Sequence, residues 1–309
     1  MNDSKKPENI VHISEENLEA SFRTLGPSMA VSKGHYELPS VAEVRDLDWN
    51  HMDHHHRHHV HQLYEETLRI ARGADCAASL TRIRVGPFKF FVLVTDLRIK
   101  PGVFYQVFTI FNLIYVHTIT RSIPGKGVGE KGALRTVRWY IVSPRWFKFL
   151  HPSINRKMDH INKAQNPQDA PVLKWRTDIR KKGFSFASDN PDYLNSNLLT
   201  MNVRYPKLGQ IHRIPVENLP LDQVSIVSAG PIDLLVRRQA DHKIEVWLRN
   251  CPHEGAPLET GILIGCEFKC PWHGLKFSAL VLDQTSSSGK LANFEIKLSS
   301  KELVISGKS

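Results

Sequence analysis

The sequence predicts an α+β chain of two domains, and three of its features support that prediction. Runs rich in Val, Ile, Phe, Tyr and Thr fill residues 80–142 and are separated by Gly-Pro pairs, as in an antiparallel sheet. Two helical segments follow, and a second set of short strand-like runs begins near residue 224. A length of 309 residues, 41% of them hydrophobic, is enough for two packed cores.

The first sheet is expected to be an antiparallel meander. Its strands are predicted at residues 80–85, 88–97, 103–119 and 134–142. The breaks between them consist of the turn-forming residues Gly86-Pro87, Pro101-Gly102 and Pro124-Gly125. The run 103–119 is the most apolar of the chain, but Gln106, Asn112 and His117 interrupt it. Buried strands are therefore expected there rather than a membrane-spanning helix.

Helices are predicted before and after this sheet. The stretch 14–22 begins with Ser14 and two glutamates, which is typical of a helix N-terminus. The remainder of the first 50 residues is expected to be polar and frayed. Two further helices are predicted at 153–165 and 170–182, and Gly183 suits the left-handed residue that ends a helix.

Two short loops in the C-terminal third combine cysteine with histidine. Strands are predicted around them at 224–227, 232–237, 243–248, 275–282 and 295–305. The loops read Cys251-Pro252-His253 and Cys270-Pro271-Trp272-His273, a C-x-H-x16-C-x2-H pattern. A Rieske [2Fe–2S] cluster takes two thiolates on one iron and two imidazoles on the other. The pattern therefore predicts Cys251, His253, Cys270 and His273 as cluster ligands.

Other roles for these cysteines fit the pattern less well. Zinc sites with the same residue types usually have C-x2-4-C and H-x3-5-H spacing, whereas each loop here holds one Cys and one His. A disulfide between Cys251 and Cys270 would need an oxidising compartment. The two remaining cysteines, Cys76 and Cys266, are expected to be buried free thiols.

With these motifs, residues 210–309 resemble the Rieske domain of ring-hydroxylating oxygenases and related ferredoxins. High-potential Rieske proteins of respiratory chains carry one more cysteine in each loop, and those two form a disulfide. This chain has Ala256 and Trp272 at those places. The resemblance is therefore to the lower-potential, soluble branch.

A histidine-rich tract at residues 48–61 is the second notable motif. It contains seven of the sixteen histidines of the chain. Composition alone allows three interpretations: a low-complexity metal-scavenging tract, a solvated polar face of a helix, or a specific iron site. Iron(II) sites that activate O₂ commonly use two His and one carboxylate, which leaves other positions of the metal open.

The tract also resembles the catalytic iron site of Rieske oxygenases. Asp53-x2-His56-x4-His61 is similar to the Asp-x2-His-x4-His segment of that family. The segment around Asp169 resembles the one that carries the carboxylate ligand in the steroid-processing branch. The resemblance implies His56, His61 and Asp169 as ligands of a mononuclear Fe(II). It implies Asp53 as a catalytic acid that bridges a Rieske histidine and an iron-ligating histidine.

Other registers and other acids stay open. On a straight helix, at about 100° per residue, His56 and His61 diverge by about 140°. They converge only if the helix is distorted, for example by a π-bulge. Undistorted i, i+4 ladders are also present: His51, His55 and His59, and His54 with His58. Asp159 is the alternative to Asp169, which could instead be an acid that favours a helix N-terminus near Pro171.

The same resemblance implies the domain organisation. Residues 1–45 would be an N-terminal extension, residues 46–205 a helix-grip (START-like) catalytic domain, and residues 206–309 the all-β Rieske domain. Typical members place the Rieske domain first, so this chain would be a permuted version. In the family the two metal centres meet across a subunit boundary in a trimer, which makes a homo-oligomer an expectation here too.

The implied activity is that of a Rieske mono- or dioxygenase. An NAD(P)H-dependent reductase or a ferredoxin would supply electrons, and O₂ would hydroxylate, demethylate or desaturate an apolar, aromatic or steroid-like molecule. His253 and His273 would lie at an exposed tip, and four aromatic residues would line the substrate pocket: Phe91, Phe104, Phe108 and Phe111. The alternative is a Rieske ferredoxin-like electron carrier fused to a non-catalytic ligand-binding domain.

The charge and the N-terminus limit partners and location. The net charge of +10 fits an acidic redox partner, an anionic substrate, a membrane surface or simply a solvated basic surface. Nucleic acid is disfavoured, because the basic residues are scattered and form no recognition motif. Residues 1–10 are polar and unlike a secretory signal. A cytoplasmic location, where NAD(P)H is present, is therefore expected.

Overall fold

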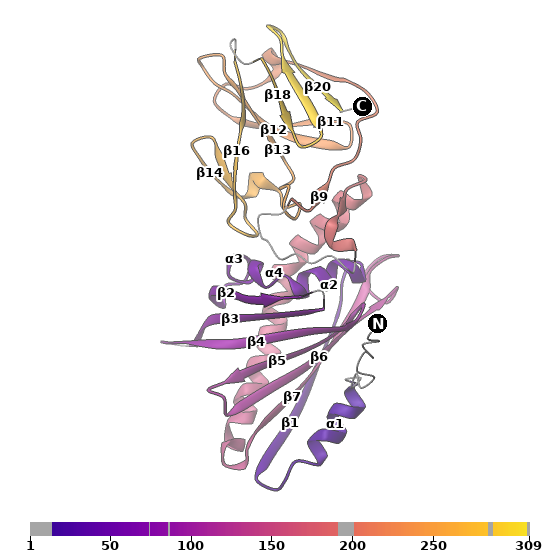
Figure 1. Cartoon of the computed structure of the whole chain (residues 1–309), viewed down its shortest axis with the longest axis vertical. Coiled ribbons are helices and arrows are strands. Elements are labelled where there is room, and N and C mark those ends of the chain that lie inside the picture. The colour runs from indigo at the N-terminus through magenta and orange to yellow at the C-terminus, as the bar shows by residue number, and fades with distance from the viewer. Residues whose placement is uncertain (1–13, 74, 86, 191–200, 284–286, 308–309) are drawn as a thin grey trace, which may run out of the picture. The chain divides into compact units, whose positions relative to one another are not determined.

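The computed structural model describes residues 14–73, 75–85, 87–190, 201–283 and 287–307. By their contacts these residues form two compact units (Figure 1). Unit 1 consists of Met1–His54 and Leu63–Pro167, and unit 2 consists of His55–Gln62 and Gln168–Ser309. The first ten residues, on which the expected location rests, lie outside the described part of the chain.

Unit 1 is built on one seven-stranded antiparallel sheet with the order β1-β7-β6-β5-β4-β3-β2. From β2 to β7 each strand pairs with the next one along the chain, which confirms the predicted meander. Strand β1 pairs with β7 at one edge. The strands are β1 Met29–Pro39, β2 Tyr64–Arg72, β3 Cys76–Val85, β4 Phe88–Lys100, β5 Val103–Ile110, β6 Ile114–Pro124 and β7 Ala133–Pro144.

The predicted single strand at 103–119 is wrong, because the chain turns within it. Strands β5 and β6 are separated by a tight turn in which Phe111 and Asn112 have φ values of 53° and 55°. Asn is one of the few residue types that adopt this left-handed region readily. Asn112 therefore carried a turn signal that the apolar residues around it obscured.

The N-terminal region is more ordered than predicted. Helix α1 Glu15–Arg23 is present as expected, and the Ser14 hydroxyl accepts a hydrogen bond from the Asn17 N–H at 3.1 Å. Strand β1, however, occupies part of the stretch that was expected to be frayed. A Cβ at Gly34 would lie 2.3 Å from the Trp139 ring on β7, so only glycine fits at this pairing. The boundaries of an N-terminal extension stay a prediction.

One long helix, α4 His151–Lys181, replaces the two predicted helices. It runs through Pro167 and Pro171, each of which lacks the N–H that would bond to the carbonyl four residues earlier. Near these prolines the side-chain amides of Asn162 and Asn166 donate to carbonyl oxygens one turn earlier, at 2.9 and 2.6 Å. The predicted break between residues 165 and 170 is therefore wrong, because the helix continues through both prolines.

The two halves of α4 belong to different units, since the division falls after Pro167. In unit 1, Met158 is buried in the core cluster of the sheet with Trp139 and Ile141. In unit 2, Ile179 belongs to the core of the β-domain. The helix ends as predicted at Gly183, whose φ is 92°.

Unit 2 contains the all-β domain at the C-terminal end of the chain. Two four-stranded antiparallel sheets, β10-β20-β19-β18 and β11-β12-β13-β17, share its core with the small β8-β9 pair. A three-stranded sheet β14-β15-β16 leads into the second cysteine loop. The strands are β8 Ser185–Phe186, β9 Val203–Arg204, β10 His212–Pro215, β11 Val224–Ala229, β12 Ile232–Arg238, β13 Ile244–Leu248, β14 Ile262–Ile264, β15 Glu267–Lys269, β16 Lys276–Ser278, β17 Leu280–Leu282, β18 Ser288–Leu291, β19 Phe294–Leu298 and β20 Glu302–Gly307.

The fold class predicted from the sequence is confirmed. The N-terminal half of the chain combines an antiparallel sheet with the long helix α4, the helix-grip arrangement, and the C-terminal domain is all-β. Among the described helices, none combines the length and the apolar character that crossing a bilayer requires. The remaining helices are α2 Val44–Met52, α3 Arg57–Val60 and the 3₁₀ turns η1 His54–His56, η2 Arg145–Leu150, η3 Ala187–Asp189, η4 Val216–Asn218 and η5 Leu258–Thr260.

Candidate metal centres

The two Cys/His loops of unit 2 share one backbone pattern. In both, the cysteine N–H donates to the carbonyl five residues onward, at 2.8 Å in the first loop and 2.7 Å in the second. The glycine four residues after each cysteine donates back to the cysteine carbonyl, at 2.8 and 2.9 Å. These glycines, Gly255 and Gly274, have φ values of 83° and 68°, a conformation that glycine adopts without strain. The loops therefore present their side chains in matching ways.

The four predicted cluster ligands meet in one buried place. Nδ1 of His253 lies 3.3 Å from Nδ1 of His273, and the two rings meet edge to face. The thiols of Cys251 and Cys270 lie within hydrogen-bonding distance of each other. Two adjacent thiols and two adjacent imidazole nitrogens are the donor set of a Rieske [2Fe–2S] cluster, so the residues present fit that group.

The thiols differ in their acidity. Burial raises the pKa of Cys251 well above its ordinary value, and the neighbouring Cys270 adds to the increase. The hydrogen bond with Cys251 and the contact with His273 outweigh the opposing effect of burial and together lower the pKa of Cys270 to about 5. One thiolate is thus favoured at neutral pH, and thiolate is the form that binds metal.

The sequence-based view of the ligand surroundings needs two corrections. His253 and His273 were expected at an exposed tip, but they are only 2% and 5% exposed. The N–H of Asn202, just before β9, donates to the His253 carbonyl at 3.2 Å, so this segment packs against the first loop. Cys76 and Cys266 are free thiols as predicted, but both are exposed rather than buried, at the start of β3 and in the turn before β15.

The histidine tract does not form one straight helix. Helix α2 ends at Met52, and Asp53 has φ −85° and ψ 79°. The 3₁₀ turn η1 and the four-residue helix α3 follow, and His61 is already extended, with φ −105° and ψ 123°. The predicted divergence of His56 and His61 on a helix therefore does not arise. The distortion is a helix end before His61 and not a π-bulge.

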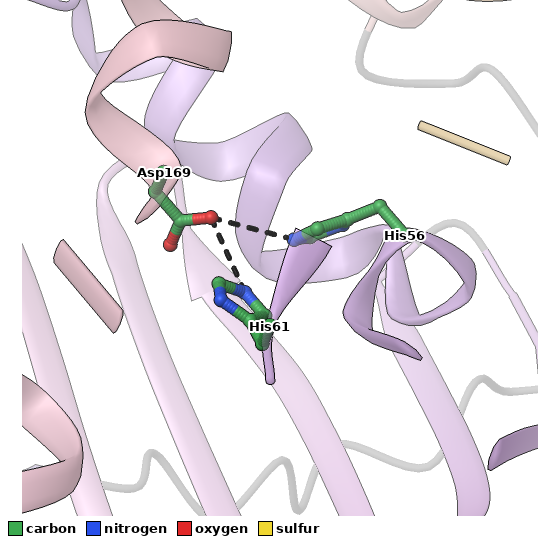
Figure 2. A group of neighbouring side chains, drawn as sticks. All are labelled: His56, His61 and Asp169. Carbon is green, nitrogen blue, oxygen red and sulfur yellow. Dashed lines mark ion pairs between the residues drawn. The ribbon is translucent and has the colours of Figure 1, made fainter. Parts of the chain in front are cut away.

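This break lets His56 and His61 face the same carboxylate (Figure 2). Asp169 Oδ1 lies 3.2 Å from Nε2 of His61 and 3.6 Å from Nε2 of His56. One ligand atom from each residue can be chosen so that all three lie within 4.8 Å of one another, and all three side chains are buried. This is the single group of its kind among the described residues. All three residues belong to unit 2.

The surroundings of this group suit a metal cation. The Gln168 side-chain oxygen lies 3.1 Å from Nδ1 of His61. If Nδ1 donates this hydrogen bond, Nε2 keeps its lone pair toward Asp169. Burial raises the pKa of Asp169, but the contacts with His56 and His61 outweigh it and hold the pKa below its usual range. A buried, ionised carboxylate with two imidazoles fits a divalent iron.

Two other histidines of the tract have a different carboxylate. In unit 1, Nε2 of His51 lies 2.8 Å from Asp96 Oδ1, and Nε2 of His54 lies 2.5 Å from Asp96 Oδ2. The Gln106 amide also donates to Asp96 at 2.7 Å. Sequence reasoning missed Asp96. The sequence did contain a sign of it: Asp96 follows Val92 and Val94 at every second position of a β-strand. It therefore shares their buried face, where an acid needs polar partners.

The remaining predicted acids are placed as follows. Asp53 is buried at the end of α2, where its N–H donates to the Trp49 carbonyl at 2.9 Å. Its bridging role stays a prediction. Asp159, the alternative to Asp169, pairs with Lys163 at 2.7 Å and its side chain is 43% exposed. It is not part of the metal-binding group.

The expected aromatic lining of a pocket is wrong in part. Phe91 and Phe111 are 49% and 73% exposed, so they do not line an interior cavity. Phe104 is buried and lies against the His51 ring, with centroids 4.4 Å apart. Phe108 packs on the core cluster of the sheet. Phe104 and Phe108, four residues apart on β5, share one face of the sheet, whereas Phe91 on β4 points to the other face and Phe111 lies in the turn after β5.

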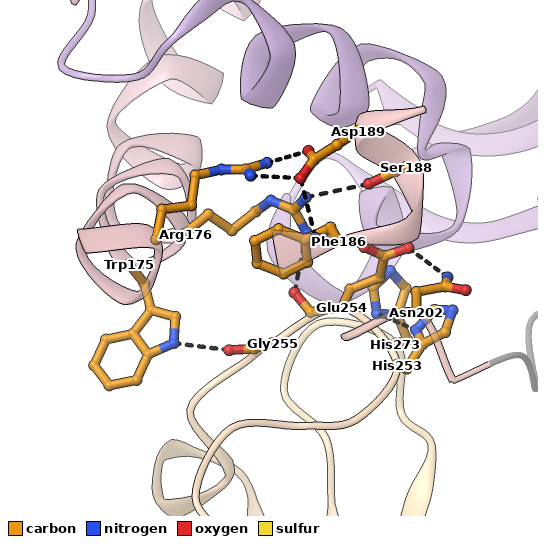
Figure 3. A network of polar contacts seen from close by, with 11 residues as sticks. Trp175, Arg176, Phe186, Ser188, Asp189, Asn202, His253, Glu254, Gly255 and His273 are labelled. Atoms are coloured by element: carbon orange, nitrogen blue, oxygen red, sulfur yellow. Dashed lines mark hydrogen bonds and ion pairs between the residues drawn. The ribbon is translucent and has the colours of Figure 1, made fainter. Parts of the chain in front are cut away.

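A buried polar network holds the first cysteine loop and was also missed (Figure 3). Arg176 on α4 donates to the Glu254 carboxylate at 2.9 Å and to the Glu254 carbonyl at 3.1 Å. The Asn202 amide donates to the other carboxylate oxygen of Glu254 at 2.8 Å. The Trp175 indole N–H donates to the Gly255 carbonyl at 2.8 Å. The available signal was that Arg176 follows Asp169 by seven residues, which places both on one helix face.

Several solved structures share weak similarity of fold with the chain. Norcoclaurine synthase from Thalictrum flavum matches with a TM-score of 0.39 and 13% identity, over 48% of this chain and 98% of that one. The di-domain ARO/CYC StfQ of the steffimycin biosynthetic pathway matches with a TM-score of 0.41 and 8% identity, over 48% of this chain and 52% of that one.

Two curated proteins match over short stretches. The oxygenase component of dicamba O-demethylase from Stenotrophomonas maltophilia is 46% identical over 44 residues, which is 14% of this chain and 13% of that protein. Apoptosis-inducing factor 3 from Mus musculus is 37% identical over 57 residues, 18% of this chain and 9% of that protein. The chain thus spans only a small part of either relative.

The family comparison agrees with the geometry of the loops. The Rieske [2Fe-2S] domain matches residues 211–293, a range that contains both Cys/His loops. Such a domain exchanges electrons with a redox partner. The C-terminal part of this chain is therefore a Rieske [2Fe–2S] domain.

Proposed function

We propose that this chain is a Rieske-type oxygenase. The observation that carries the proposal is the group formed by His56, His61 and Asp169, which lies in the same compact unit as the four Rieske ligands. Two imidazoles and one carboxylate are the usual protein ligands of non-haem Fe(II) sites that activate O₂. A Rieske electron carrier has no need of such a group.

In this proposal each residue has a stated part. Nε2 of His56, Nε2 of His61 and Oδ1 of Asp169 hold the iron, and Gln168 orients the His61 ring through Nδ1. A bound iron of this type supplies positions for O₂ and electrons for its activation. Burial of all three ligand side chains keeps water away from the site, and the sequence-based role of Asp53 as a bridging acid belongs to the same proposal.

The substrate class and partners follow from the same proposal. The electron donor would be an NAD(P)H-dependent reductase or a ferredoxin, and the product a hydroxylated, demethylated or desaturated apolar molecule. The 44-residue stretch that is 46% identical to the oxygenase component of an O-demethylase supports an oxygenase. It does not select a substrate, because fold and cofactor are shared by many activities.

Metal analysis tests the proposal directly. Iron and acid-labile sulfide are measured per chain for the anaerobically purified protein and for the His56→Ala variant. We expect about three irons to two sulfides in the wild type and about two to two in the variant, with the same Rieske EPR signal after reduction. A wild-type ratio of two to two that added Fe(II) does not change would contradict the proposal. It would favour an electron carrier fused to a ligand-binding domain.

A further inference from the structure

The helix that carries Asp169 also holds the first Rieske loop. Asp169 and Arg176 are both on α4, seven residues apart, and therefore lie two turns apart on one face. Arg176 donates to both the side chain and the backbone carbonyl of Glu254, the residue directly after the ligand His253. One rigid element thus connects a predicted ligand of the mononuclear site with a cluster loop of the same chain.

The contact between Arg176 and Glu254 is built into the interior of unit 2. Arg176 is 0% exposed and Glu254 is 2% exposed. The guanidinium lies 3.6 Å from the centre of the Phe186 ring and donates to Ser188 at 3.3 Å. A charged pair this deeply buried is costly to form unless its geometry is held by further hydrogen bonds. Figure 3 draws the hydrogen bonds that hold this pair in place.

The histidine tract reaches the second Rieske loop independently. A Cβ at Gly274, which directly follows the ligand His273, would lie 2.8 Å from Cε1 of His59. The His59 ring therefore touches the loop backbone itself. In the sequence, His59 lies between His56 and His61, which together with Asp169 are the predicted iron ligands. All of these residues belong to unit 2.

We propose that the cluster and the mononuclear site that work as a pair belong to one and the same chain, and that Arg176, held by Glu254, is the positioning residue that couples them. This inference rests on the proposed function. It differs from the arrangement that the family resemblance implies, in which the two centres meet across a subunit boundary. In the proposed pairing, helix α4 contacts the first Cys/His loop through Arg176, and the histidine tract contacts the second loop through His59.

The pairing would serve the transfer of one electron from the cluster to the mononuclear site. A cluster held by the four Cys/His ligands would give up one electron, and an iron held by His56, His61 and Asp169 would accept it. The redox partner protein replaces the electron at the cluster, so no other reductant is needed. No bond forms or breaks in this step.

The pairing is tested without turnover, with Co(II) as the probe at the mononuclear site. Reduction with dithionite gives the cluster its EPR signal, and a paramagnetic Co(II) nearby shortens the relaxation time of that signal. Two variants are combined. The His56→Ala/His61→Ala variant keeps only the cluster, and the Cys251→Ser/Cys270→Ser variant keeps only the Co(II) site. Chains with two different tags are expressed together, and mixed oligomers are captured through both tags.

We expect Co(II) to shorten the relaxation time in the wild-type protein and to leave it unchanged in mixed oligomers. If the protein proves to be a monomer and Co(II) still shortens the relaxation time of the cluster signal, the proposal is supported equally, because no second chain is present. An effect in mixed oligomers as large as in the wild type would overturn it. A wild-type protein that contains its [2Fe–2S] cluster but binds no Co(II) would instead refute the proposed function. Failure of the same-chain pairing and failure of the proposed function are therefore distinguishable.

A second set of variants covers the case in which the double cysteine variant does not fold. Arg176→Leu should keep the Co(II) content and the cluster g-values but reduce the relaxation effect several-fold, and Arg176→Lys should restore much of it. Arg180→Leu is the matched control, because Arg180 lies one turn later, contacts the same Phe186 ring at 4.6 Å and pairs with Asp189. An unchanged relaxation effect in Arg176→Leu would overturn the positioning role.

Discussion

Two clusters of this molecule contain the same three groups, two imidazoles and a carboxylate, yet their atoms are arranged differently. In the Asp96 cluster, each histidine faces its own carboxylate oxygen, His51 at 2.8 Å and His54 at 2.5 Å. In the Asp169 cluster, His56 and His61 face one and the same oxygen at 3.6 and 3.2 Å. In the Asp96 cluster, each histidine forms its own hydrogen bond with the carboxylate. In the Asp169 cluster, the two imidazole nitrogens and the carboxylate oxygen converge on one position.

The outer ring nitrogens strengthen this contrast. In the Asp96 cluster, Nδ1 of His54 lies 2.7 Å from the Ser79 hydroxyl, and Nδ1 of His51 lies 3.3 Å from the Arg135 guanidinium. Asp96 also accepts a hydrogen bond from Gln106. These contacts give the Asp96 cluster the character of a structural network. Residue composition therefore does not decide the role of a His/His/Asp group; the convergence of the ligand atoms does.

The largest expected difference between the clusters concerns metal binding. His61→Ala should weaken Co(II) binding at the mononuclear site by at least about 100-fold, since loss of a direct ligand exceeds the 10- to 100-fold cost of losing an outer partner. His54→Ala changes a residue that is in neither ligand set, so it should leave that affinity within the error of the wild type. Titration of the iron-free protein with Co(II) measures both. Equal losses would mean that the two clusters bind metal alike.

Stability should respond in the opposite order. Asp96→Asn should lower the free energy of unfolding by roughly 3–5 kcal/mol, the usual cost of leaving buried partners of a charged pair uncompensated. In the metal-free protein, Asp169→Asn should cost no more than about 2 kcal/mol, because its contacts with His56 and His61 are longer than those of Asp96 with His51 and His54. Urea unfolding of both variants decides the matter. A larger loss in Asp169→Asn would reverse the roles assigned to the two carboxylates.

The acid limb of stability gives a further test of the Asp96 cluster. Burial raises the pKa of Asp96, but His51 and His54 outweigh it and bring the pKa well below its ordinary value. A carboxyl whose pKa is lowered in the folded state stabilises the fold above the pKa of the unfolded state, about 3.9, and loses that contribution as pH falls further. The stability difference between wild type and Asp96→Asn should therefore shrink as the pH falls below about 4. A difference that grows in acid would contradict the charged form of Asp96.

The comparison also shows what the sequence could predict. The Cys/His spacing was sufficient for the Rieske loops, because a ligand set within two short loops is a local property of the chain. The pattern of Val, Ile and Phe was likewise sufficient for the antiparallel meander, although it did not reveal the turn between β5 and β6. The choice among seven histidines was not local. It depended on where α2 ends and on a carboxylate more than a hundred residues away.

The parts that could not be predicted share one physical cause. Asp96 reads as one acid in an apolar strand, and its partners His51 and His54 are more than forty residues distant in sequence. Arg176 reads as one of many basic residues on α4, and only its burial against Glu254 separates it from the solvated ones. Pro167 indicates a helix end by local rules, but packing on both sides of it keeps α4 continuous. Tertiary contacts decided each case.

The smallest expected effect separates orientation of a ligand from support of the fold. Gln168→Ala removes the oxygen 3.1 Å from Nδ1 of His61 and should weaken Co(II) binding by about 10-fold, because the ring loses the partner that fixes its tautomer. Ser79→Ala removes the corresponding partner of His54 and should leave Co(II) affinity unchanged while costing about 1 kcal/mol of stability. Co(II) titration and urea unfolding are carried out on both variants. If both changes weakened metal binding to the same degree, the outer contacts would act through the fold as a whole. If only Gln168→Ala does so, the orientation of one imidazole is what distinguishes a metal ligand from a structural histidine in this chain.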